Sequence, residues 1–115
     1  MAQWTEESVA VELLACEDER RDRPPFTDEW PELDLDTGYR IQDRTLAMRL
    51  ARGEKLIGVK LGLTSRAKQQ RMGVHTPFVA WLTDAMLLPA GDPIPQDRLI
   101  PVSYTHLTLP TSDLV

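Results

Sequence analysis

Nine prolines divide this 115-residue chain into two parts of different character. The pair Pro24-Pro25 follows a helical pattern that begins after Thr5, so the first helix should run to about Arg23. Beyond Val74, prolines instead alternate with short apolar segments, a pattern typical of short strands joined by turns. The sequence therefore predicts an α+β fold in which helices come first and a β-rich portion follows.

A second helix is predicted from a cap at Asp36 to about Arg52, with Gly53 supplying a left-handed stop. Its polar face, which includes Arg49, is expected to be solvated. The apolar spacing predicts a buried face of four residues: Tyr39, Leu46, Ala47 and Leu50. The corresponding face of the first helix consists of Val9, Leu13 and Cys16. Residues 26–35, between the two helices, should form an extended connection whose aromatic side chains cover them.

The segment from Leu56 to Leu63 is short, apolar and β-branched, and it is predicted to be a strand. With a period of two, one face is apolar and is expected to be core: Ile57, Val59, Leu61 and Leu63. The other face places Lys60 between Gly58 and Gly62. Glycine weakens a strand unless something approaches the backbone closely, so this pair favours space for a ligand beside the lysine. The alternative interpretation is an exposed strand face with a solvated lysine.

A short helix from Arg66 to Met72 should follow the strand, capped by Thr64 or Ser65 and closed by Gly73. Its free backbone N–H groups could receive an anion such as a substrate carboxylate, although most such turns are ordinary capped helices. Asp84, next to an apolar segment, is predicted to be either a site carboxylate or a capping aspartate at a turn.

Composition excludes several classes of function. Eighteen acidic against 13 basic residues give a net charge of −5 without a long basic run, which argues against a nucleic-acid partner. No segment approaches the roughly 18 apolar residues of a membrane span, and the acidic start lacks the basic region of a signal peptide. The expected compartment is therefore the cytoplasm. His75 and His106 have no recognisable metal-site spacing, and no metal ligand is predicted.

The run from Gly58 to Lys68, together with Met72-Gly73-Val74 and the segment from Leu82 to Met86, resembles a known family. This is the family of 2-oxo-3-hexenedioate decarboxylase (4-oxalocrotonate decarboxylase) and 2-oxopent-4-enoate hydratase, within the fumarylacetoacetase-like superfamily. The resemblance covers about residues 5–101 and implies the start of an incomplete mixed β-roll. It further implies an oligomeric, Mg²⁺-dependent lyase that acts on a small 2-oxo dicarboxylic acid in meta-cleavage catabolism of aromatic compounds.

The resemblance also implies roles for individual residues. Lys60 would be catalytic, stabilising an enolate oxygen or assisting proton transfer from a desolvated environment. Substrate contacts would be made by Gly62, Thr64, Ser65 and Asp84. The sequence from Gly62 to Lys68 resembles the decarboxylase branch, and Phe78 stands where hydratases more often carry an aspartate. The decarboxylase, which forms 2-hydroxypenta-2,4-dienoate, is therefore preferred over the hydratase.

The resemblance stops near Pro101. The family continues with glutamates that bind Mg²⁺, whereas no glutamate follows Glu54 here, so the metal is expected in the complete enzyme without ligands from this chain. Residues 102–115 contain SYTHLTLPT, which resembles a translated adapter, and are expected to be non-native. Residues 1–101 are then the N-terminal part of a longer lyase, inactive alone. A further alternative is a non-catalytic module that docks on a full-length relative.

Overall fold

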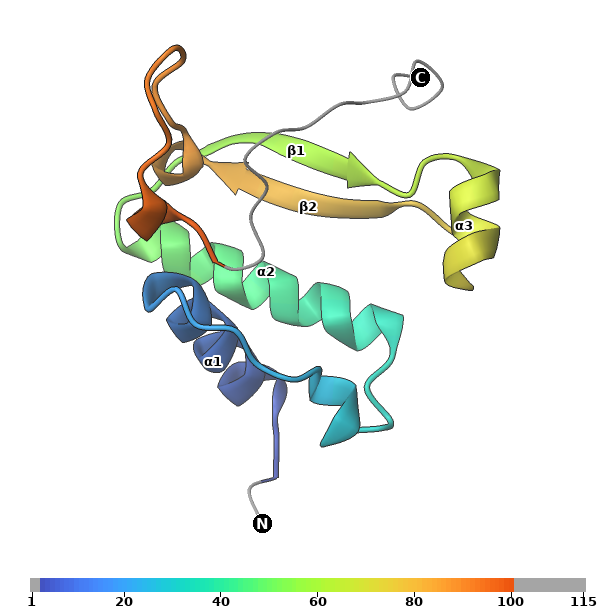
Figure 1. Ribbon diagram of the computed structural model, residues 1–115. Coiled ribbons are helices and arrows are strands. Elements are labelled where there is room, and N and C mark those ends of the chain that lie inside the picture. Colours follow the sequence, from blue (N-terminus) through green and yellow to red (C-terminus); the bar gives the residue numbers. More distant parts are fainter. Residues whose placement is uncertain (1–2, 101–115) are drawn as a thin grey trace.

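The computed structural model describes residues 3–100, which contain three α-helices and a two-stranded antiparallel sheet (Figure 1). The helices and strands are, in chain order, α1 (Glu6–Asp18), α2 (Leu35–Ala51), β1 (Leu56–Gly62), α3 (Arg66–Met72) and β2 (Phe78–Thr83). Short 3₁₀ turns occur at Phe26–Asp28, Asp84–Met86 and Gln96–Arg98. The α+β class predicted from the sequence agrees with this arrangement. The expected non-native tail, 102–115, lies outside the described residues.

Helix α1 begins as predicted but ends earlier than the prolines suggested. The Thr5 hydroxyl accepts a hydrogen bond from the Ser8 N–H at 3.1 Å, and the Ser8 hydroxyl accepts one from the Thr5 N–H at 2.8 Å. The helix ends at Asp18 rather than near Arg23, because Arg20 adopts a left-handed φ of 53°. The Arg21 N–H then donates to the Cys16 carbonyl at 2.8 Å, which closes the last turn well before Pro24.

Helix α2 corrects two predictions. Its cap is Asp34, whose carboxylate accepts from the Thr37 N–H at 2.8 Å, so Asp36 lies in the first turn instead. Its buried residues are Thr37 and Ile41, whereas two of the residues predicted to be buried, Ala47 and Leu50, are exposed. Helix α1 packs against α2 and β2 approaches it, but the Ala47 and Leu50 part of the predicted stripe stays exposed.

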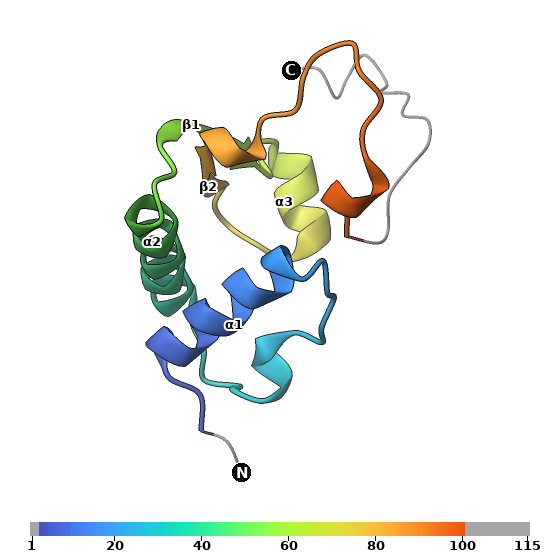
Figure 2. The same cartoon turned by 90° about the vertical axis from the view of Figure 1, so that its left-hand side faces the viewer.

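The core lies between α1 and α2, with α2 placed between α1 and the sheet (Figures 1 and 2). Its buried residues are Val9, Ala10, Phe26 and Ile41, with Trp4, Leu13, Trp30, Leu33 and Met48 packed around them. The connection between the helices is not simply extended, since it begins with the 3₁₀ turn Phe26–Asp28. Its aromatic residues nevertheless cover the helices as predicted. Phe26 is buried and packs edge to face against Trp4, with the two ring centroids 4.9 Å apart.

A conservative core substitution tests this packing. Ile41→Val removes one buried methylene and should lower the free energy of unfolding by about 1 kcal/mol. Leu50→Ala removes more atoms, but from a side chain that is 44% exposed, and should cost less than about 0.5 kcal/mol. Urea denaturation followed by circular dichroism measures both. A larger loss for Leu50→Ala than for Ile41→Val would show that the predicted stripe, not the observed one, is the core.

The sheet has one edge covered and one edge open among the described residues. In the ladder, Lys60 pairs with Ala80 and Leu61 with Val79, and a bulge lies between Leu56 and Gly58. The Val79 N–H donates to the Tyr39 hydroxyl at 3.2 Å, and the Gln42 amide donates to the Val79 carbonyl at 3.0 Å. Helix α2 thus takes up the outward hydrogen-bonding groups of Val79 in β2. Because antiparallel pairs alternate, the N–H and C=O of Leu61 point to the opposite, outer edge of β1.

The strand prediction was correct in position and wrong about burial. Strand β1 spans Leu56–Gly62, and Leu63 lies just beyond it with a left-handed φ of 53°. Of the face predicted to be core, Ile57 and Val59 are each 48% exposed and Leu61 is 60% exposed. An alternating pattern identifies an apolar face but does not supply the layer that covers it. The proline-rich segment 87–95 forms no strand, so within residues 3–100 the β-rich portion is a single hairpin-like pair.

Candidate functional site

Lys60 lies near the middle of β1, with its side chain exposed. Gly58 and Gly62 lie two positions away on either side, on the same face of the strand. A Cβ atom built at either glycine would meet no atom within 4 Å, so the space beside the lysine is open. In the described chain this surface is an exposed strand face. This agrees with the alternative considered from the sequence, in which the lysine is solvated. The surface leaves room for a ligand at the backbone.

The turn after β1 places three of the predicted substrate contacts close together in the chain. Gly62 ends the strand, the left-handed Leu63 redirects the backbone, and Thr64 is exposed before α3 begins. Ser65 is the helix cap, and its hydroxyl accepts from the Lys68 N–H at 3.2 Å. Gly73 closes α3 with a φ of 73°, as predicted. The Ser65 hydroxyl therefore has a structural partner, while the Thr64 hydroxyl faces solvent.

Asp84 lies at the other end of the ladder. Its carboxylate accepts from the Lys55 N–H at 2.9 Å, and its own N–H donates to the Lys55 carbonyl at 2.9 Å. These two bonds fasten the end of β2 to the start of β1, so the Asp84 carboxylate bonds across the ladder and does not cap the turn that follows β2. Lys60 pairs with Ala80, four residues before Asp84, a separation of roughly 13 Å along a strand. The described residues thus bring Lys60 and Gly62 together but leave Asp84 apart from them.

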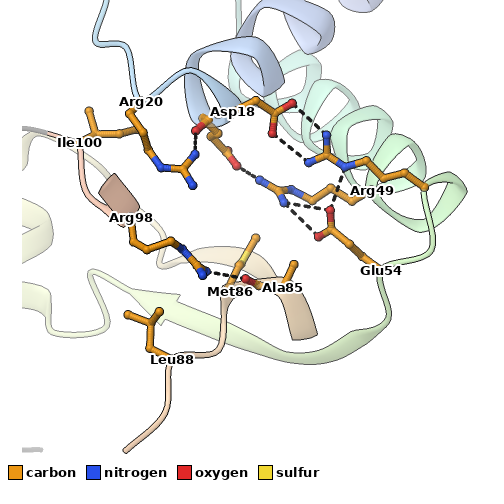
Figure 3. Close-up of a pocket in the computed structure, with 11 residues that line it drawn as sticks. Asp18, Arg20, Arg49, Glu54, Ala85, Met86, Leu88, Arg98 and Ile100 are labelled. Atoms are coloured by element: carbon orange, nitrogen blue, oxygen red, sulfur yellow. Dashed lines mark hydrogen bonds and ion pairs between the residues drawn. The ribbon is translucent and has the colours of Figure 1, made fainter. Parts of the chain in front are cut away.

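A partly buried ionic cluster was missed by sequence reasoning. The Glu54 carboxylate accepts from the Thr83 hydroxyl at 2.6 Å, from Arg52 Nε at 2.9 Å and from Arg49 Nη1 at 3.0 Å. Figure 3 shows Arg49 and Glu54 directed toward each other. The Arg49 side chain, expected to be solvated, is only 11% exposed, and the Glu54 side chain is equally covered. Arg49 also pairs with Glu17 of α1. Because the members of this cluster come from α2, the loop after it and β2, no local spacing in the sequence announces it.

The electrostatics of this Glu54 cluster favour the charged carboxylate. Burial alone would raise the pKa of Glu54. Hydrogen bonds from Thr83, Arg52 and Arg49 outweigh this effect and hold the pKa of Glu54 at about 2, below its ordinary 4.5. The carboxylate is thus fully engaged in holding α2 to β2, which leaves it poorly suited to act as a general acid or base near neutral pH.

The described residues do not fit a magnesium ion. Within residues 3–100, no group of three or more His, Cys, Asp or Glu side chains is placed so that it could hold a metal. Glu54, which is largely buried, already has two arginines and a threonine as partners.

Over the same residues, no helix is long and apolar enough to cross a membrane.

Comparison with known proteins identifies homologues of two kinds, although no protein-family profile matches the chain. The chain is 39% identical over 90 residues to 2-hydroxypent-2,4-dienoate hydratase of Pseudomonas putida, covering 77% of this chain and 40% of the hydratase. It is 33% identical over 93 residues to 4-oxalocrotonate decarboxylase of Pseudomonas sp. strain CF600, covering 81% of this chain and 35% of that enzyme.

A solved structure shares the fold. The 4-oxalocrotonate decarboxylase of Pseudomonas putida G7, complexed with magnesium and adipate, superposes with a TM-score of 0.69 and 31% sequence identity. The superposition covers 75% of this chain and 34% of that enzyme. The resemblance inferred from the sequence is confirmed by these homologues. The chain spans 40% or less of the length of these three relatives.

Proposed function

We propose that this chain forms the Lys60-bearing part of a lyase that decarboxylates 2-oxo-3-hexenedioate (4-oxalocrotonate) to 2-hydroxypenta-2,4-dienoate. The observation that carries the proposal is the strand, turn and helix from Gly58 to Met72, which combine the family-like sequence with a fold related to that of a 4-oxalocrotonate decarboxylase. In the proposed scheme, residues 1–101 belong to a fumarylacetoacetase-like domain with a mixed β-roll, residues 102–115 are not native to it, and the complete enzyme is oligomeric and cytoplasmic.

The chemistry assigns Lys60 a defined task. Loss of carbon dioxide leaves an electron pair that flows toward the 2-oxo group, and a cation beside that oxygen stabilises the resulting dienolate. The Lys60 ammonium would provide this charge or move a proton. Magnesium, for which the described residues offer no ligand group, would supply electrophilic stabilisation in the complete enzyme. We place the substrate against the open backbone at Gly62, within reach of Thr64 and Ser65, and assign Asp84 to the far end of the site.

The exposure of Lys60 determines what this chain can do alone. Proton transfer near neutral pH requires a lysine whose ammonium form is disfavoured by desolvation. In the described chain the lysine lies on an uncovered strand face. We therefore propose that additional structure must cover this face before catalysis is possible.

Two alternatives follow from specific observations. The higher identity to the hydratase, 39% against 33% for the decarboxylase, favours water addition to 2-oxopent-4-enoate on the same scaffold. Phe78 in place of the hydratase aspartate favours decarboxylation. A third possibility, a non-catalytic module that docks on a full-length relative, is supported by the exposed apolar face of β1.

A domain replacement tests these functions. The purified 115-residue chain should show no magnesium-dependent decarboxylation of 4-oxalocrotonate. A chimera, in which residues 3–100 replace the matching part of the P. putida G7 decarboxylase, should catalyse this decarboxylation. Loss of substrate absorbance and release of carbon dioxide measure the reaction.

The other outcomes separate the alternatives. A folded chimera that hydrates 2-oxopent-4-enoate without releasing carbon dioxide would support the hydratase. A folded chimera without either activity would contradict both enzymes. Turnover by the 115-residue chain alone would contradict the requirement that Lys60 be covered.

A further inference from the structure

A cavity lies away from the open Lys60 surface, where the ends of α1 and α2 meet the segment 84–100 (Figure 3). Its volume is about 420 Å³, within the range of small-molecule sites. Four arginines and three acidic residues line it. All three acids have arginine partners: Glu17 and Glu54 pair with Arg49, and Asp18 pairs with Arg52. Two arginines therefore serve as partners of all three acids, and the four arginines exceed the three carboxylates by one positive charge.

The other two arginines, Arg20 and Arg98, make a different kind of contact. Arg20 donates from Nε to the Asp97 carbonyl at 2.7 Å and from Nη1 to the Glu17 carbonyl. Arg98 donates from Nη2 to the Ala85 carbonyl at 2.8 Å. Within residues 3–100, neither guanidinium pairs with a carboxylate, and each keeps N–H groups that these bonds do not use. Two guanidinium groups without a carboxylate partner thus line one cavity, whose lining carries one excess positive charge.

The geometry places these two charges beside an apolar wall. Figure 3 shows both guanidinium groups directed into the space between the end of α1 and the segment 84–100. Met86, Leu88 and Ile100 line the same cavity. A matching ligand would combine a planar anion, which a guanidinium binds through two N–H groups, with a short hydrocarbon chain. A bare inorganic anion would satisfy the arginines but not this wall.

We propose that this cavity binds a short aliphatic carboxylate, with the carboxylate between Arg20 and Arg98 and the chain against Met86, Leu88 and Ile100. The site is separate from the Lys60 surface, and it does not depend on the proposed lyase activity. Arg20 already connects the end of α1 to the turn at Asp97. A carboxylate bound by both arginines adds a second connection, so binding also holds the segment 84–100 against the helices.

The ligand itself provides the first test. Hexanoate titrated into the ¹⁵N-labelled 115-residue chain should cause saturable shifts in amide resonances of residues 84–100 and of Arg20. The neutral analogue 1-hexanol should cause none, because it cannot pair with the arginines. Inorganic phosphate should bind more weakly than hexanoate, because it makes no contact with the apolar wall. Absence of saturable hexanoate binding, or equal binding of hexanol or phosphate, would overturn the proposal.

Variants then identify the residues. Arg20→Gln and Arg98→Gln should each weaken hexanoate binding about tenfold or more, since each removes one charge-assisted contact. Arg20→Lys should retain part of the affinity. Arg44→Gln is the matched control: it removes the same charge from an exposed pair with Glu7 on the helices and should leave binding unchanged. Circular dichroism confirms the fold of each variant. Wild-type affinity in both folded glutamine variants would contradict the assignment.

Discussion

Replacing Lys60 by methionine in the chimera should lower kcat for decarboxylation by about 100-fold or more. Methionine keeps the length of the side chain but removes the ammonium group, so the dienolate loses a stabilising charge or a proton carrier. The side chain is exposed and lies on an open surface of β1, so the stability of the isolated chain should be unchanged. Steady-state kinetics with 4-oxalocrotonate, measured across a range of pH, check the result.

Lys55→Met is the control for this experiment. Lys55 is also exposed, it lies just before the same strand, and its contacts with Asp84 use its backbone groups. The substitution removes the same charge while keeping those contacts, so kcat should stay close to that of the unmodified chimera. If the Lys60 and Lys55 variants lose activity equally, or if neither loses any, Lys60 has no catalytic role.

Replacing Glu54 by alanine should lower the free energy of unfolding by about 3 kcal/mol. The substitution leaves the largely buried Arg49 with Glu17 as its only carboxylate partner among the described residues, and it leaves the fully buried Thr83 hydroxyl without an acceptor. Glu54→Gln keeps an acceptor for both and should cost less, about 1–2 kcal/mol. Glu7→Ala removes an equal charge from an exposed pair with Arg44 and should cost less than about 1 kcal/mol. Urea denaturation at pH 7 compares the three variants, and equal losses for Glu54→Ala and Glu7→Ala would contradict the prediction.

The same residue makes stability depend on pH. The pKa of Glu54 is about 2 in the folded chain, against 4.5 ordinarily, so folding favours the ionised form. The resulting stabilisation is fully present above about pH 5 and is lost as the pH falls from there toward 2. The Glu54→Ala variant lacks this contribution, so its stability should fall less steeply over that interval. Denaturation curves measured at pH 6, 4 and 3 for both proteins give the comparison, and parallel losses would count against it.

Local chemistry made most of the caps predictable from the sequence, although the cap of α2 is Asp34 rather than Asp36. Thr5, Ser65, Gly53 and Gly73 occupy the positions expected of them, because capping depends on residues only a few positions apart. The early end of α1 was not predictable in this way. It depends on a left-handed arginine, Arg20, a conformation that sequence patterns assign to glycine or asparagine.

The candidate site was predictable only in part, for a related reason. The alternation around Lys60 correctly placed it between two glycines on one strand face. The opposite face was expected to be buried, but burial depends on which other element packs against it, and here Leu61 remains 60% exposed. The Glu54 cluster joins residues that lie far apart in the chain, such as Arg49 and Thr83. Such clusters arise from tertiary packing and leave no periodic signal.

Val79 donates a hydrogen bond to Tyr39 and accepts one from Gln42, so its outward backbone groups are not available to a further strand. Helix α2 occupies this position beside β2, and a further strand could not pair with Val79 without displacing the helix. Any strand added from the same or another polypeptide must join beside β1, using the N–H and C=O groups of Leu61. It would then run next to Lys60 and bring its own side chains level with it. Because α2 occupies the β2 edge, a strand that covers Lys60 has to approach from the β1 edge.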